Sequence, residues 1–85
     1  MGKKERREIE KEVNELLTDF GFVDPQNIVS QLQAIFNVEI GDINKTGLVR
    51  ARTVYEVHYY DYIIELEIKN YELKIKDIKL YDDML

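Results

Sequence analysis

The segment 53–80, which reads TVYEVHYYDYIIELEIKNYELKIKDIKL, decides the fold of this 85-residue chain. Apolar and polar residues alternate along most of it, the period of two that is typical of a strand with one buried face. The alternation changes phase twice: odd positions are apolar up to Tyr59, even positions from Ile64 to Ile68, and odd positions again from Tyr71 to Ile75. These phase changes predict three consecutive antiparallel strands.

Two-residue turns at Asp61-Tyr62 and Lys69-Asn70 place apolar residues opposite apolar residues on the buried face. Across the first turn the expected pairs are Tyr59 with Ile64, Val57 with Leu66, and Tyr55 with Ile68. Across the second they are Ile68 with Tyr71, Leu66 with Leu73, and Ile64 with Ile75. On the opposite face, the same pairing places His58 across from Glu65. Another change of phase predicts a bulge or turn near Lys76-Asp77, followed by a loose acidic tail over 81–85.

Upstream of this meander, the segment 38–40 alternates as a short strand would. The stretch from Gly41 to Gly47 is rich in turn-forming residues and predicts a loop. The first long strand is therefore expected to begin near Leu48.

Two amphipathic helices are expected before the strands. The first runs from about Lys3 to Asp19, with its first turns frayed and charged, and Gly21 is suited to cap its C-terminus. Its apolar stripe has the spacing of one helical face and consists of Ile9, Val13, Leu16, Leu17 and Phe20.

The second helix has a clear start, because Asp24 is a good N-cap and Pro25 suits the first helical position. Its stripe consists of Ile28, Val29, Leu32, Ile35 and Phe36, and Asn37 is expected to end it. Between the helices, Phe22 and Val23 are expected to plug one end of a helical hairpin. The whole chain, 1–85, is expected to form one α+β domain with this hairpin packed on a three- or four-stranded antiparallel meander, in ααβββ order.

Composition excludes several classes of chemistry. There is no Cys, so disulfide frameworks, thiol nucleophiles and cysteine-ligated metals are absent. The chain has one His and one Ser, and we expect no cofactor and no catalytic triad. No apolar run is long enough to span a membrane, and the lack of Cys suits a reducing compartment, so a soluble cytoplasmic protein is expected.

The outward face of the first strands carries the candidate binding residues, which are Arg50, Arg52, His58, Tyr60 and Tyr62. Tyr and Arg dominate the energetics of protein interfaces, so this face is predicted to bind a protein partner or a second copy of the chain. The same residues suit an alternative, a single-stranded nucleic-acid interface in which bases stack on Tyr rings. The net charge of −5 argues against general binding to a phosphate backbone.

A third interpretation starts from Glu65, Glu67 and Lys69, which alternate on one strand after an upstream Asp42 or Asp61. This arrangement resembles the active-site pattern of the PD-(D/E)xK nucleases. The resemblance implies a Mg²⁺ ion held by the carboxylates and a Lys that stabilises charge at the phosphate. It covers only a handful of residues, and those nucleases have a helix after the motif strand where this chain has another strand.

The function expected from the sequence is a small acidic, non-enzymatic interaction module of the inhibitor or adaptor type. Some proteins of this class are encoded by phages and mobile elements. Their acidic surfaces can occupy a partner's nucleic-acid groove by mimicking phosphate charge, an analogy of class rather than of family. A homodimer formed at an edge strand or at the outward face is a further expectation.

Overall fold

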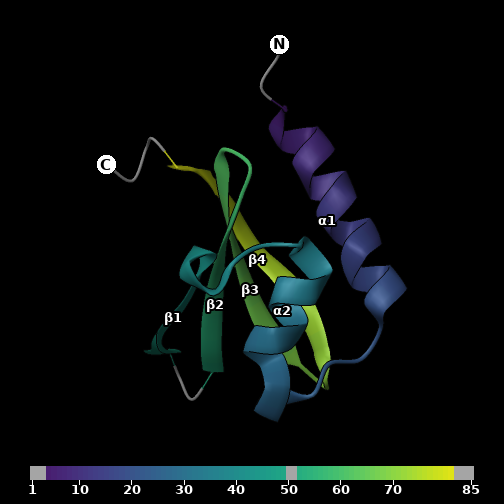
Figure 1. The fold of residues 1–85 in the computed structure, drawn as a ribbon, viewed down its shortest axis with the longest axis vertical. Helices are drawn as coiled ribbons and strands as arrows, with labels where there is room; N and C mark the ends of the chain where they lie inside the picture. The colour runs from purple at the N-terminus through teal and green to yellow at the C-terminus, as the bar shows by residue number, and fades with distance from the viewer. Residues whose placement is uncertain (1–3, 50–51, 82–85) are drawn as a thin grey trace.

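The computed structural model describes residues 4–49 and 52–81, and the side chains of residues 46–49 and 52 lie outside this description. These residues form two α-helices and a four-stranded antiparallel sheet in the order β1-β2-β3-β4, which confirms the α+β class (Figure 1). The helices are α1 (Arg6–Phe20) and α2 (Ile28–Phe36), and the strands are β1 (Ile43–Val49), β2 (Arg52–Tyr59), β3 (Tyr62–Lys69) and β4 (Glu72–Leu80). Within the described residues, no helix has the length and apolar character needed to cross a membrane.

The helix boundaries follow local capping chemistry. The first helix begins at Arg6, later than the predicted Lys3, and ends at Phe20. Gly21 follows as its C-cap, with a φ of 83° that is readily adopted only by glycine. Asp24 accepts a hydrogen bond from the backbone N–H of Gln26 and caps a short 3₁₀ turn, η1 (Pro25–Asn27), that leads into α2. Asn37 ends α2 in the left-handed conformation, as the sequence predicted.

The region before the long strands differs from the prediction. Ile40 lies in a second 3₁₀ turn, η2 (Ile40–Asp42), and is 66% exposed, so the predicted short strand at 38–40 is wrong. The predicted loop is also wrong, because Ile43–Val49 forms the edge strand β1. The register shifts between Thr46 and Leu48, which leaves Gly47 as the extra residue of a bulge. Turn-rich composition is tolerated here because an edge strand pairs on one side only and a bulge accommodates glycine.

The two hairpins keep the predicted buried face but shift the register by two residues. Across the first turn the structure pairs Tyr59 with Tyr62, Val57 with Ile64, and Tyr55 with Leu66. Across the second it pairs Ile68 with Leu73, Leu66 with Ile75, and Ile64 with Ile78. The turns are consequently at Tyr60-Asp61 and Asn70-Tyr71. A shift of two residues preserves every side chain's face, so the apolar pattern alone could not distinguish the two registers.

The predicted irregularity near Lys76-Asp77 is confirmed. The register of β4 shifts where Leu66 pairs with Ile75 and Glu65 pairs with Asp77, which makes Lys76 the extra residue. The extra residue shifts the alternation of β4 by one position. Ile78, at an even position, therefore lies on the same buried face as Leu73, at an odd position.

The core lies between the helices and one face of the sheet. Its members come from α1, α2, the link between them, and strands β2 to β4: Ile9, Val13, Val23, Ile28, Leu32, Ile35, Phe36, Tyr55, Val57, Tyr62, Ile64, Leu66, Leu73 and Ile78. Figure 1 shows α2 in front of the sheet and α1 alongside β4, with which it is in contact. The opposite face, called the open face below, carries Val54, Glu56, His58, Ile63, Glu65 and Glu67.

Candidate functional site

The predicted binding face is only partly assembled by the fold. The side chains of Arg50 and Arg52 lie outside the described residues. His58 does lie on the open face, half-buried, where its ring stacks on Tyr81 with centroids 4.6 Å apart and planes 9° apart. Its Nδ1 atom lies 3.9 Å from the carboxylate of Asp42. His58 is therefore held between an aromatic ring and an acidic group.

Tyr62 is not on the open face, and this part of the prediction is wrong. It is 6% exposed and belongs to the core. Its hydroxyl donates a 3.0 Å hydrogen bond to the backbone C=O of Lys4. The turn at Tyr60-Asp61 makes Tyr62 the first residue of β3, where even-numbered residues face the helices, so the parity of β2 does not extend to it.

Tyr60 is 56% exposed but takes part in a contact that ties the β2–β3 turn to the start of α1. The ammonium of Lys4 lies 4.6 Å from the centroid of the Tyr60 ring, a cation–π distance. The same ammonium donates a 2.6 Å hydrogen bond to Glu12. This group of residues, Lys4, Glu12, Tyr59 and Tyr60, is called the Lys4 strap below.

The Lys4 strap perturbs two titrating groups. Burial raises the pKa of Tyr59 to about 12, and the nearby charge of Glu12 contributes in the same direction. The hydroxyl of Tyr59 also donates a 3.4 Å hydrogen bond to Glu12. Hydrogen bonding to Glu12 raises the pKa of Lys4. Both shifts favour the protonation states present at neutral pH, in which the hydrogen bonds to Glu12 are kept. The cation–π contact with Lys4 gives Tyr60 a structural role.

The open face is rich in carboxylates without forming a metal centre. Glu56 lies directly opposite Glu65, and Glu65 forms a 2.9 Å ion pair with Lys79, whose pKa is raised by that hydrogen bond. Among the described residues, no group of three or more His, Cys, Asp or Glu side chains is arranged to hold a metal ion. The geometry therefore offers no support for the resemblance to metal-dependent nucleases.

A pair of exposed aromatic side chains forms a surface that the sequence pattern did not predict. Phe22 is 72% exposed and Tyr71 is 64% exposed, and both line one open, mainly apolar hollow. They come from the α1–η1 link and from the β3–β4 turn. The backbone N–H of Val23 donates a 2.7 Å hydrogen bond to the C=O of Tyr71, which joins the two segments. We call Phe22 and Tyr71 the aromatic tip.

Tyr71 has an unusual backbone conformation for a large residue. Its φ is 63° and that of Asn70 is 54°, so both central residues of the turn have positive φ, as in type I′ hairpins. Asn tolerates this conformation, whereas Gly is the preferred second residue. The tip was missed because the predicted turn left Tyr71 in a strand. The sequence did contain one signal for the observed turn: Asn70 tolerates positive φ and therefore suits the first central position of the turn. Val23 is buried as expected, but Phe22 is not.

Next to the tip, α1 and the free edge of β4 enclose a groove. Its first hollow, of about 240 Å³, begins at Gly21 and Glu72, the chain neighbours of the tip residues. A second hollow, of about 410 Å³, continues toward Arg6 and Asp77. Asn14, Lys74 and Ile75 line both hollows, so the two are continuous. We call this the β4 groove.

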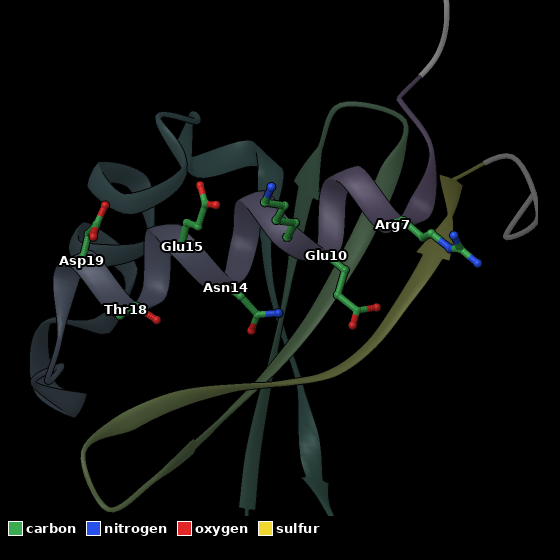
Figure 2. Close-up of a pocket in the computed structure, with 7 residues that line it drawn as sticks. Arg7, Glu10, Asn14, Glu15, Thr18 and Asp19 are labelled. Carbon is green, nitrogen blue, oxygen red and sulfur yellow. The ribbon is translucent and has the colours of Figure 1, made fainter.

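The exposed face of α1 carries another shallow depression, lined only by polar and charged residues of that helix: Arg7, Glu10, Lys11, Asn14, Glu15, Thr18 and Asp19. Figure 2 shows the labelled side chains spread along α1 and pointing to both sides of the helix. They do not converge on one point, and their charges are of mixed sign. This arrangement is that of a solvated helix face.

No protein-family model, curated protein or solved structure matches this chain. Its function is therefore inferred from the chemistry of its surface, in which the aromatic tip and the adjoining β4 groove are the most distinctive features.

Proposed function

We propose that this chain is a small, non-enzymatic protein-interaction module of the inhibitor or adaptor type, and that it binds a partner protein through the aromatic tip. The observation that carries the proposal is the joint exposure of Phe22 (72%) and Tyr71 (64%) on segments tied together by the Val23–Tyr71 hydrogen bond. Aromatic side chains are enriched among the residues that dominate binding energy at protein interfaces. A cytoplasmic location is part of the proposal, supported by the absence of Cys.

The backbone of Tyr71 supports this assignment. A left-handed conformation costs a non-glycine residue about 1–2 kcal/mol, and Gly at this position would avoid the cost. The ring of Tyr71 recovers little of that energy within the fold, because most of it is exposed. Backbone strain that the fold does not need is typical of positions retained for function.

We place partner binding at the tip, whereas the sequence pattern predicted it at Tyr60 and Tyr62 of the sheet face. Tyr62 is buried, and Tyr60 lies under the ammonium of Lys4. The Tyr62 ring is therefore not accessible to a partner, and the Tyr60 ring, although 56% exposed, is already engaged by Lys4. His58 stays a candidate for a secondary contact on the open face, because its ring is only half-buried.

The experiment compares capture of a stoichiometric partner from the native host by three forms of the protein. These are the wild type, a tip variant (Phe22→Asn with Tyr71→Gly), and a control (Ile40→Asn). Ile40 is a matched control because it is a large exposed apolar residue, 66% accessible, on η2. We expect the wild type and the control to retain the partner and the tip variant to lose it.

Retention of the same partner by the folded tip variant with unchanged affinity would contradict the proposal. Sedimentation of the purified protein at several concentrations tests whether the tip binds a second copy of the chain. A dimer that the tip variant converts to a monomer would show that the tip binds a second copy instead.

A further inference from the structure

The aromatic tip is too small to form a stable interface alone. A large aromatic side chain buries roughly 150–250 Å². Two of them supply less than the roughly 800 Å² per partner that a standard protein interface buries. A partner that binds at the tip must therefore cover an adjoining surface as well, and the β4 groove begins at Gly21 and Glu72, the chain neighbours of Phe22 and Tyr71.

The floor of the β4 groove is the unpaired side of an edge strand. Among residues 4–49 and 52–81, β4 is the last strand of the sheet and pairs only with β3. In an antiparallel ladder, alternate residues turn their backbone N–H and C=O groups away from the neighbouring strand. Among the described residues, none of the backbone hydrogen bonds formed outside the helices and ladders involves Leu73 or Ile75. Such an edge can accept another strand.

The groove has a second wall that an ordinary sheet edge lacks. Along it, α1 contributes Asn14, Leu17 and Thr18 opposite Leu73 and Ile75. The lining is mixed: Leu17, Leu73 and Ile75 are apolar, whereas Asn14 and Thr18 are polar. Strand addition between an edge strand and a neighbouring helix is an established mode of peptide recognition, in which backbone bonds give affinity and side-chain pockets give specificity.

The charges on the groove indicate the chemistry of its occupant. Three basic residues, Arg6, Lys74 and Lys76, and three acidic residues, Glu10, Glu72 and Asp77, line it. The Lys74 ammonium lies 3.5 Å from the carboxylate of Glu72, and Arg6 lies 3.4 Å from Asp77. Among the described residues, no carboxylate lies within 4 Å of the Lys76 ammonium. An acidic side chain on an added strand would pair with the Lys76 ammonium, and a second would compete with Glu72 for Lys74.

We propose that the partner contributes an extended segment that alternates apolar and acidic residues and adds to β4 as the fifth strand of the sheet. This inference rests on the proposed function and names the kind of segment that the interaction module binds. Apolar side chains of the segment would enter the groove beside Leu17 and Ile75, and acidic ones would face Lys74 and Lys76.

The test uses a blocked synthetic peptide of alternating valine and glutamate, titrated into the isotope-labelled full chain and followed by NMR. We expect shift changes in the backbone amides of residues 72–78 and 14–21, and slower exchange of the N–H groups of Leu73 and Ile75. A peptide with lysine in place of glutamate should bind at least about tenfold more weakly. A peptide with a central proline should bind more weakly too, because proline removes a ladder hydrogen bond.

The matched protein variants are Lys74→Glu with Lys76→Glu, which should weaken binding of the glutamate peptide by about tenfold or more, and Lys45→Glu on the opposite edge strand β1, which should leave it unchanged. Their spectra also show whether each variant is folded. Absence of shifts up to about 1 mM peptide, shifts confined to β1 or the open face, or equal binding of the lysine peptide would overturn the inference.

Partner capture separates this inference from the proposed function. Capture that is lost in the tip variant but kept in the folded Lys74→Glu, Lys76→Glu variant would leave the proposed function standing and refute strand addition. Peptide binding at β4, together with capture that does not depend on the tip, would refute the proposed function and leave strand addition standing.

Discussion

The backbone N–H of Val23 lies 2.7 Å from the C=O of Tyr71 and donates a hydrogen bond to it. This bond joins the link after α1 to the β3–β4 turn, which are about fifty residues apart in the sequence. Because Val23 is also 3% exposed and packed in the core, the turn is fixed to the body of the domain. The exposed rings on either side of the bond, Phe22 and Tyr71, are thus presented from a rigid support.

Replacing Tyr71 by Gly should stabilise the protein while abolishing partner binding. Relief of the positive φ is worth about 1–2 kcal/mol, and the greater freedom of Gly in the unfolded chain offsets about 0.5–1 kcal/mol of it. We therefore expect a net gain of roughly 0.5–1 kcal/mol, measured by urea unfolding. The matched control is Tyr71→Ala, which also removes the ring but keeps the strained backbone. A Gly variant no more stable than the Ala variant would show that the turn carries no strain.

The Lys4 strap should make the protein sensitive to alkaline conditions. Because the pKa of Tyr59 is raised to about 12 from the usual 10, the folded state favours the neutral phenol. This contribution is complete below pH 10 and is lost as the pH rises from 10 through about 12. The raised pKa of Lys4 acts in the same direction, because its bond to Glu12 is lost when the ammonium deprotonates.

The measurement is a spectrophotometric titration of tyrosinate in the wild type and in Tyr59→Phe, so that their difference isolates one of the six Tyr residues. We expect the difference curve to have its midpoint near pH 12 or to coincide with alkaline unfolding. In Glu12→Gln the midpoint should move down, because a negative charge beside the phenol has been removed. A midpoint near 10 in the wild type would contradict the strap.

The extent of sequence-based prediction follows from what each pattern can distinguish. Periodicity identified both helices, the buried face of the meander and the bulge at Lys76, because burial directly determines these features. Periodicity cannot distinguish two strand registers that differ by two residues, because both place the same side chains on the buried face. The register depends instead on which residues form the turn. The choice of turn determined the candidate site: it moved Tyr62 into the core and Tyr71 to the surface. The strand at Ile43–Val49 was missed because its stability comes from pairing with β2 rather than from local propensity.

Truncation at the centre of the sheet should show how thin the core is. Leu66 is fully buried in β3, between Tyr55 and Ile75 in the pairing. Leu66→Ala should lower the free energy of unfolding by about 3 kcal/mol, a large share of what a domain of this length has. As a matched control, Ile64→Val at an equally buried position should cost about 1 kcal/mol. A similar decrease in the free energy of unfolding in both variants would show that Leu66 is not at the centre of the core.

Engineered cysteines can test the register directly, because the chain has no cysteine of its own. Glu56 lies directly opposite Glu65 in the structure, whereas the register predicted from the sequence places His58 there. Residues directly opposite on one face of an antiparallel pair lie close enough for a disulfide. We therefore expect Glu56→Cys with Glu65→Cys to oxidise readily and to stabilise the fold by about 2 kcal/mol, helped by removal of two facing carboxylates.

The comparison variant is His58→Cys with Glu65→Cys, in which the two residues are diagonal neighbours in the structure and should oxidise slowly or at the cost of stability. Thiol titration after exposure to a mild oxidant measures the yield, and thermal unfolding measures the effect on stability. Preferential oxidation of the His58 pair would restore the register predicted from the sequence. It would also return Tyr62 from the core to the turn that the sequence predicted at Asp61-Tyr62, where it would again be a candidate binding residue.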